Sequence, residues 1–85
     1  MKEFNHVIAD PQGVHARPAG DLVKIAKTFE CAIGIHFDGK SGDCKKIFTV
    51  MALGVKPGHE VTITVEGEDE AAAAEAMESF FKANL

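Results

Sequence analysis

Along this chain, segments in which hydrophobic residues recur at every second position, as in strands, are interspersed with segments in which they recur at every third or fourth position, as in helices. This alternation restricts the possible folds more than any other feature. It predicts strands over residues 4–8, 33–37, 40–44 and 61–65, and helices over 16–29 and 47–53. A last helix begins near the acidic run 68–70 and ends near Ala83. The predicted order is βαββαβα.

Two glycine-containing turns fix how these elements connect. Asp38-Gly39 is a strong hairpin signal between the second and third strands, and Gly54 closes the second helix. Each long helix has one apolar stripe, which predicts one small sheet with its helices on one face, an α+β fold. Sequential placement puts the last strand between the first and the second. We expect a single domain over residues 1–85.

Composition excludes several classes of protein. No stretch is long and apolar enough to span a membrane, and the N-terminus lacks the basic and apolar regions of a signal peptide. The formal net charge of −4 argues against general nucleic-acid binding, which requires a basic face. A cytoplasmic protein without membrane insertion or nucleic-acid partners is the expectation.

Cysteines and histidines show no metal-ligand spacing. Cys31 and Cys44 lie on either side of the predicted hairpin, so a disulfide is conceivable, but two reduced thiols are favoured in a cytosolic protein. The four histidines are scattered along the chain, and no metal site is predicted.

The segment 13–20, with sequence GVHARPAG, is the chemically informative part of the chain. His15 falls where the first long helix begins, and Pro18 suits the first turn of that helix. Free N–H groups at a helix start bind anions, so those of Ala16 and Arg17 are candidates to hold an oxyanion. Because a proline disfavours helical geometry in the residue before it, strain is expected at Arg17.

This location gives His15 a possible role as a nucleophile. The positive end of a helix disfavours imidazolium, so a ring nitrogen stays free to attack at neutral pH. The same field stabilises a phosphoryl group once it is attached, and Arg17 can bind phosphate through two parallel hydrogen bonds. The alternative is that His15 is only a cap or surface residue and Arg17 is merely solvated.

The motif Gly13-Val14-His15-Ala16-Arg17-Pro18-Ala19 closely resembles the active site of the HPr family, the histidine-containing phosphocarriers of the bacterial sugar phosphotransferase system. The chain length, the element order, the Asp38-Gly39-Lys40 hairpin and the stretch 51–55 are also similar. The resemblance covers the whole chain. It implies an open-faced β-sandwich of four antiparallel strands and three helices.

The resemblance also implies a function. His15 would accept a phosphoryl group on Nδ1 from enzyme I and pass it to IIA domains of sugar permeases, with Arg17 stabilising the phosphate. Such a protein is a substrate of phosphotransferases and not itself an enzyme. It requires no cofactor, and we expect a monomer. A carrier of the nitrogen branch with the same histidine chemistry stays open.

A second predicted surface lies beside the histidine. Ile47, Phe48 and Met51 form a compact apolar patch on the short helix, and in the family this helix docks enzyme I and IIA domains. Core packing is an equally good interpretation for Ile47. Four further residues are predicted to border or extend this docking surface: Gly20, Lys24, Lys45 and Lys46.

Lys46 is where the chain departs from its relatives. They commonly have a serine at this position, which in many Gram-positive members is phosphorylated for regulation. Lysine has no hydroxyl, so that switch cannot operate here, and a regulatory protein that binds a transcription factor or enzyme becomes the second hypothesis. Lys46, Lys45 and Arg17 instead predict an electropositive docking face.

Overall fold

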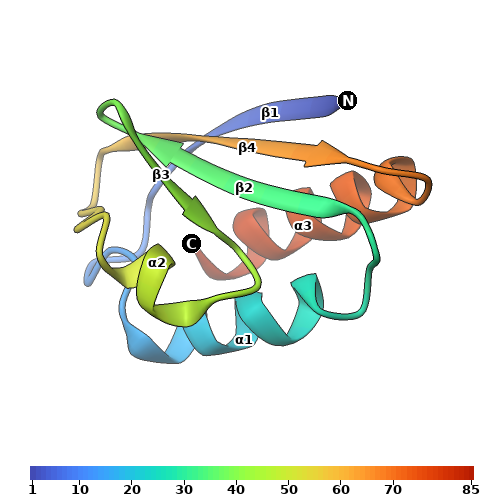
Figure 1. Ribbon diagram of the computed structural model, residues 1–85. Coiled ribbons are helices and arrows are strands. Elements are labelled where there is room, and N and C mark those ends of the chain that lie inside the picture. Colours follow the sequence, from blue (N-terminus) through green and yellow to red (C-terminus); the bar gives the residue numbers. More distant parts are fainter.

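Four strands form one antiparallel sheet, and three helices cover one of its faces in the computed structural model, which describes residues 1–85 (Figure 1). The elements are β1 (Lys2–Val7), α1 (Ala16–Ala26), β2 (Ala32–Phe37), β3 (Lys40–Asp43), α2 (Ile47–Met51), β4 (Glu60–Glu66) and α3 (Glu70–Asn84). The strand order is β1-β4-β2-β3. The predicted element order and the central position of the last strand are therefore confirmed.

Strand β4 occupies the middle of the sheet because its side chains alternate. Ile63 lies opposite Phe4 on one side and Ile35 on the other, and all three β4 residues that face the helices are buried. Thr62 and Thr64 point to the other face and are half-buried. This is the pattern of a sheet with one face against the core and one toward water.

The hairpin between β2 and β3 has the geometry that its sequence predicts. Asp38 and Gly39 both have positive φ, at 52° and 75°. Two consecutive residues with positive φ give the turn a twist that matches the twist of the flanking strands.

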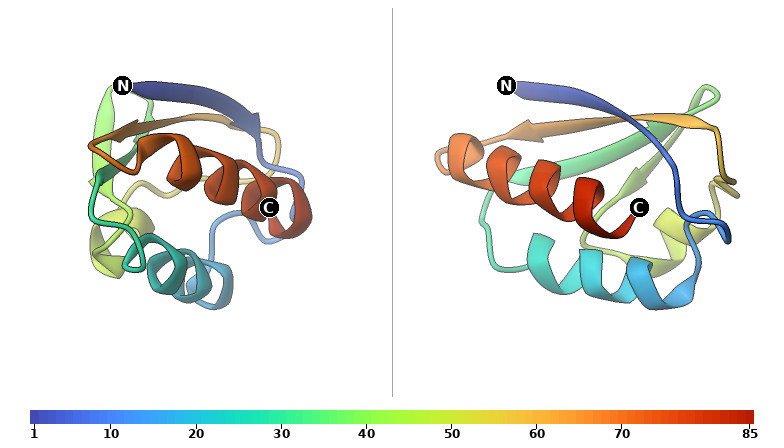
Figure 2. Two further views of the ribbon diagram at one scale, coloured as in Figure 1. Left: turned by 90° about the vertical axis from the view of Figure 1, so that its right-hand side faces the viewer. Right: turned by 180° about the vertical axis from the view of Figure 1, so that it is seen from behind.

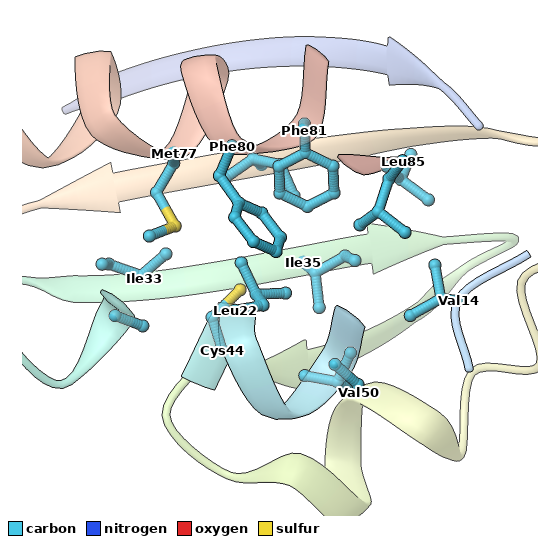
Figure 3. Close-up of a cluster of buried hydrophobic side chains, with 14 of the residues drawn as sticks. Val14, Leu22, Ile33, Ile35, Cys44, Val50, Met77, Phe80, Phe81 and Leu85 are labelled. Atoms are coloured by element: carbon cyan, nitrogen blue, oxygen red, sulfur yellow. The ribbon is translucent and has the colours of Figure 1, made fainter. Parts of the chain in front are cut away.

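Hydrophobic side chains from all three helices converge beneath the sheet (Figure 3). Leu22 comes from α1, Val50 from α2, and Met77 and Phe81 from α3. All four side chains are fully buried. No polar or charged residue belongs to the buried set. Removal of this apolar surface from water is the main contribution to the stability of such a fold.

Two helices end earlier than predicted. Helix α1 ends at Ala26, because Thr28 and Phe29 donate backbone N–H groups to carbonyls three residues back and tighten the last turn. Helix α2 ends at Met51 and is followed by Ala52 as its C-cap. Such boundary shifts are common, since helix ends fray.

Both cysteines are buried and free, as the favoured interpretation predicts. Burial raises the pKa of the Cys44 thiol to about 12 and that of Cys31 to about 11. Both thiols are therefore protonated and unreactive at neutral pH.

No helix of the chain has both the length and the hydropathy needed to cross a membrane.

Candidate functional site

His15 is the N-cap of helix α1, as the sequence predicts. Its backbone is extended, with φ −106° and ψ −178°, and its carbonyl accepts the N–H of Ala19 at 3.0 Å. The imidazole makes no capping hydrogen bond, and its side chain is 34% exposed. The ring is therefore anchored through its backbone but reachable from solvent.

The first N–H groups of α1 lack partners within the chain. Neither Ala16 nor Arg17 donates its N–H to any acceptor, and both residues are exposed. Pro18, the third residue of α1, has no N–H to satisfy, and the first turn contains no acidic residue. Two free donors and the positive end of the helix thus lie directly after His15.

Arg17 lies inside helix α1 although it directly precedes Pro18. Helix α1 includes Ala16, Arg17 and Pro18, and the only residue other than glycine with positive φ in the chain is Asp38. The preference of a residue before proline for extended geometry is a bias that helix formation overcomes here. The Arg17 guanidinium forms no ion pair within the chain.

The loop before His15 is fixed on both sides. Gly13 donates its N–H to the carbonyl of Asp10 at 2.9 Å, and Val14 donates to the carbonyl of Val55 at 3.1 Å. A Cβ on Gly13 would lie 2.5 Å from that same Val55 oxygen, so only glycine allows this approach. Val14 is buried in the core (Figure 3).

Asp10 is a site residue that sequence reasoning missed. Its Oδ1 lies 3.7 Å from Nε2 of His15, and its side chain is 24% exposed. The available signal was the turn Asp10-Pro11-Gln12-Gly13, since aspartate first, proline second and glycine fourth favour a β-turn. Such a turn folds the aspartate back toward the residues that follow.

The predicted docking patch on α2 is largely exposed. Phe48 is 84% exposed and Met51 is 39% exposed, whereas Ile47 is half-buried and packs against the core. Cδ1 of Ile47 lies 3.9 Å from the position of a Cβ on Gly20. Helix α2 therefore lies beside the N-terminal half of α1, as Figure 1 also shows. For Ile47 the core-packing interpretation is correct in part.

The structure separates the predicted lysines. Lys24 and Lys46 are exposed, and Lys46 is the N-cap of α2. Lys45 instead points its Nζ at the carbonyl of Phe29, 2.7 Å away and beyond the C-terminal end of α1. Its ammonium is thus engaged at the opposite end of α1 from His15, because a carbonyl left free at a helix end attracts a cation.

Together these residues form a candidate anion site next to an imidazole. The parts are the two N–H groups of Ala16 and Arg17, the Arg17 guanidinium and the half-exposed ring of His15. No group of three or more His, Cys, Asp or Glu side chains that could hold a metal ion gathers in the structure. Chemically, the arrangement suits a nucleophilic ring nitrogen that takes up an anionic group.

Comparison with known proteins gives this geometry a context. The family model described as "PTS HPr component phosphorylation site" matches residues 2–83. The chain is 44% identical to the phosphocarrier protein HPr of Lysinibacillus sphaericus over 77 residues, which are 91% of this chain and 88% of that protein.

Solved structures agree with this match. HPr-C-His from Thermoanaerobacter tengcongensis superimposes with a TM-score of 0.93 at 36% identity, covering 98% of this chain and 93% of that chain. Crh, a catabolite repression protein of Bacillus subtilis that forms a domain-swapped dimer, superimposes with a TM-score of 0.79 at 35% identity, covering 88% and 86%. The α+β fold, with its open four-stranded antiparallel sheet and three helices, is that of the HPr structures. The chain belongs to the HPr family of the phosphotransferase system.

Proposed function

We propose that this chain is a cytoplasmic phosphocarrier that accepts a phosphoryl group from phospho-enzyme I on Nδ1 of His15 and donates it to IIA domains of sugar permeases. The observation that carries the proposal is the position of His15 directly before two unpaired N–H groups and the unpaired Arg17 guanidinium. The protein is a substrate of its partners and turns over nothing alone. A monomer is sufficient for this role, because every part of the site comes from one chain.

The acceptor step follows from these groups. The lone pair of Nδ1 attacks phosphorus, the bond from phosphorus to the donor breaks, and the donor leaves with that electron pair. Neither ring nitrogen of His15 makes a hydrogen bond within the chain, so Nδ1 is available. Transfer to a IIA domain is the same step in reverse.

Negative charge on the phosphoryl oxygens is stabilised by donors that are already in place. The N–H groups of Ala16 and Arg17 belong to the rigid first turn of α1, so they need no rearrangement when the phosphoryl group arrives. Each hydrogen bond to a charged oxygen contributes about 1.5–3 kcal/mol. The Arg17 guanidinium adds a positive charge and a planar set of donors that suits phosphate.

The exposed patch on α2 is the proposed docking surface for enzyme I and IIA domains. Phe48 and Met51 are the exposed large apolar residues of this helix. An exposed phenylalanine offers a partner a large apolar area to bury. Gly20 lies next to the Ile47 side chain between the two helices, while Lys24 and Lys46 supply positive charge at the rim. Lys45 is omitted from this surface because its ammonium is bonded to Phe29.

The second candidate is a regulatory protein that binds a transcription factor or enzyme. The structural likeness to Crh is the observation in its favour. Lys46 argues against the serine-dependent form of such regulation, since the N-cap of α2 bears an ammonium and no hydroxyl.

Incubation with the cognate enzyme I and phosphoenolpyruvate, followed by intact mass measurement and an acid-lability test, tests the carrier proposal. The carrier gains one acid-labile phosphoryl group, and His15→Ala gains none. His36→Ala is the matched control, because His36 lies on the open face of the sheet between Ser41 and Thr64 and should leave labelling unchanged. Absence of labelling by the cognate enzyme I would overturn the proposal.

A further inference from the structure

The two nitrogens of the His15 ring lie in different surroundings. Nε2 lies 3.7 Å from Oδ1 of Asp10, whereas Nδ1 has no partner within the chain. Both side chains are partly shielded, at 34% and 24% exposure, so their attraction is screened less than that of a fully exposed pair. At 3.7 Å the contact is longer than a hydrogen bond and within the range of an ion pair.

The Asp10 carboxylate is held in place by groups other than His15. Its Oδ1 accepts the N–H of Gln12 at 2.8 Å, and its main-chain carbonyl accepts the N–H of Gly13 at 2.9 Å. Its own N–H donates to the main-chain oxygen of Leu85 at 3.1 Å. Figure 2 shows the end of α3 beside this loop. The carboxylate therefore faces Nε2 whether or not the ring is charged.

We propose that Asp10 is a positioning residue for the phosphoryl transfer of His15, an inference that rests on the proposed carrier function. A carboxylate beside Nε2 favours the tautomer that has its proton on Nε2, and this leaves the lone pair on Nδ1. It also repels a phosphoryl group that approaches Nε2. Asp10 thus directs attack through Nδ1.

The charge balance of the step gives Asp10 a second effect. When the Nδ1 lone pair forms the new N–P bond and the donor leaves, the ring keeps its proton on Nε2 and becomes positively charged. The Asp10 carboxylate stabilises that charge where it appears. On transfer to the acceptor the N–P electron pair returns to Nδ1, and the ring becomes neutral again.

A purely structural role for Asp10 predicts different results. If Asp10 only closes the turn at Gln12, its replacement changes stability but not the tautomer of His15. Asparagine at this position retains an oxygen that can accept from Gln12 or from Nε2 but has no charge. Alanine removes both the acceptor and the charge. The two variants therefore separate orientation from charge.

The test is nitrogen-15 NMR of the unphosphorylated protein, combined with phosphorylation rates, for wild type, Asp10→Asn and Asp10→Ala. In wild type, the neutral ring of His15 should have its proton on Nε2, and in Asp10→Ala it should be a mixture of both tautomers. Phosphorylation by enzyme I should slow about fivefold in Asp10→Ala, as loss of a partly exposed charge pair predicts. Asp10→Asn should retain the tautomer and lose part of the rate.

Controls make the outcomes separable. Glu68→Gln removes the same charge from an exposed residue at the far end of the molecule and should match wild type in both measurements. Amide spectra verify that each variant is folded. A wild-type tautomer and rate in Asp10→Ala would sink the role of Asp10, while failure of wild type itself to be phosphorylated would sink the carrier function and leave the tautomer comparison valid.

Discussion

Helices α1 and α3 both present a positive N-terminal end, but only α3 has an acidic residue in its first turn. Glu70 lies in the first turn of α3, where its Oε1 accepts the N–H of Gly67 at 3.3 Å and its Oε2 pairs with the Met1 amine at 2.9 Å. Helix α1 has no acidic residue in its first turn, and His15 makes no side-chain cap. The N-terminal end of α3 is therefore bound by groups of the chain itself, whereas the N-terminal end of α1 leaves its N–H donors free for an external anion.

The carboxylate of Asp69 shows how the α3 end serves the fold. Asp69 is the N-cap of α3, yet its two oxygens accept the N–H groups of Glu30 at 2.9 Å and Cys31 at 3.0 Å. These bonds hold the pKa of Asp69 below its usual range, and the bond from the Glu30 N–H contributes most. The residue therefore joins the start of α3 to the turn that follows α1.

The largest expected effect comes from giving α1 the feature that α3 has. Arg17→Glu places a carboxylate in the first turn of α1, where it should occupy the free N–H groups and repel phosphate. We expect phosphorylation by enzyme I to fall about 10²–10⁴-fold, since two charged contacts of about 1.5–3 kcal/mol each are lost. Unfolding free energy should rise by about 0.3–1 kcal/mol, because the dipole favours the new charge.

Arg17→Gln is the control for this change. It removes the guanidinium without adding an anion, so its rate should lie between those of wild type and Arg17→Glu. Near-wild-type labelling of Arg17→Glu would show that the free donors of α1 are not the phosphate site.

The next effect concerns the packing at the start of α3. A Cβ on Gly67 would lie 2.6 Å from Cβ of Cys31, and Gly67 has φ 149°. Gly67→Ala should lower the free energy of unfolding by about 2–4 kcal/mol, because both the clash and the backbone conformation are unfavourable. Urea denaturation measures this loss, and phosphorylation of the folded fraction should be unchanged.

Gly58→Ala separates the two causes. Gly58 has φ 87° but no atom within 4 Å of an added Cβ. Gly58→Ala should therefore lower the free energy of unfolding only through the unfavourable backbone conformation, by about 1 kcal/mol. Equal losses in the two variants would mean that contact with Cys31 contributes nothing.

A smaller effect follows from the lowered pKa of Asp69. Because the folded pKa lies below the unfolded one, ionised Asp69 stabilises the fold above the unfolded pKa, and this contribution disappears as pH falls through the folded pKa. Asp69→Asn should therefore be less stable than wild type at pH 7, and the difference should shrink below about pH 4. Denaturation at a series of pH values gives the comparison. A constant difference at all pH values would contradict it.

Particular residues show what the sequence could and could not predict. Alternation at Val61, Ile63 and Val65, the Asp38-Gly39 turn and the His15 motif predicted the sheet, the hairpin and the helix start, because each depends on neighbours in the chain. These are local properties of periodicity, turn geometry and capping.

The contacts that were missed join residues distant in the chain or depend on the direction of a flexible side chain. Lys45 bonds to Phe29 and Asp69 bonds to Glu30, and neither pairing has a sequence pattern. Asp10 is close to His15 in the chain, but its contact depends on the turn at residues 10–13. Side-chain direction was therefore the least predictable part of the site.

The smallest expected effect tests whether the cations beside α1 attract a partner. Lys46 is exposed at the N-cap of α2, where an anion would be favoured, so Lys46→Glu should not destabilise the fold. Its rate of phosphorylation by enzyme I should fall about threefold at low salt and match wild type near 0.5 M salt, where charges are screened beyond about 4 Å. Lys27→Glu makes the same charge change beyond the C-terminal end of α1 and should have less effect. If Lys46→Glu keeps the wild-type rate at both salt concentrations, electrostatic steering at this face has no role, and the apolar patch on α2 alone must select the partner.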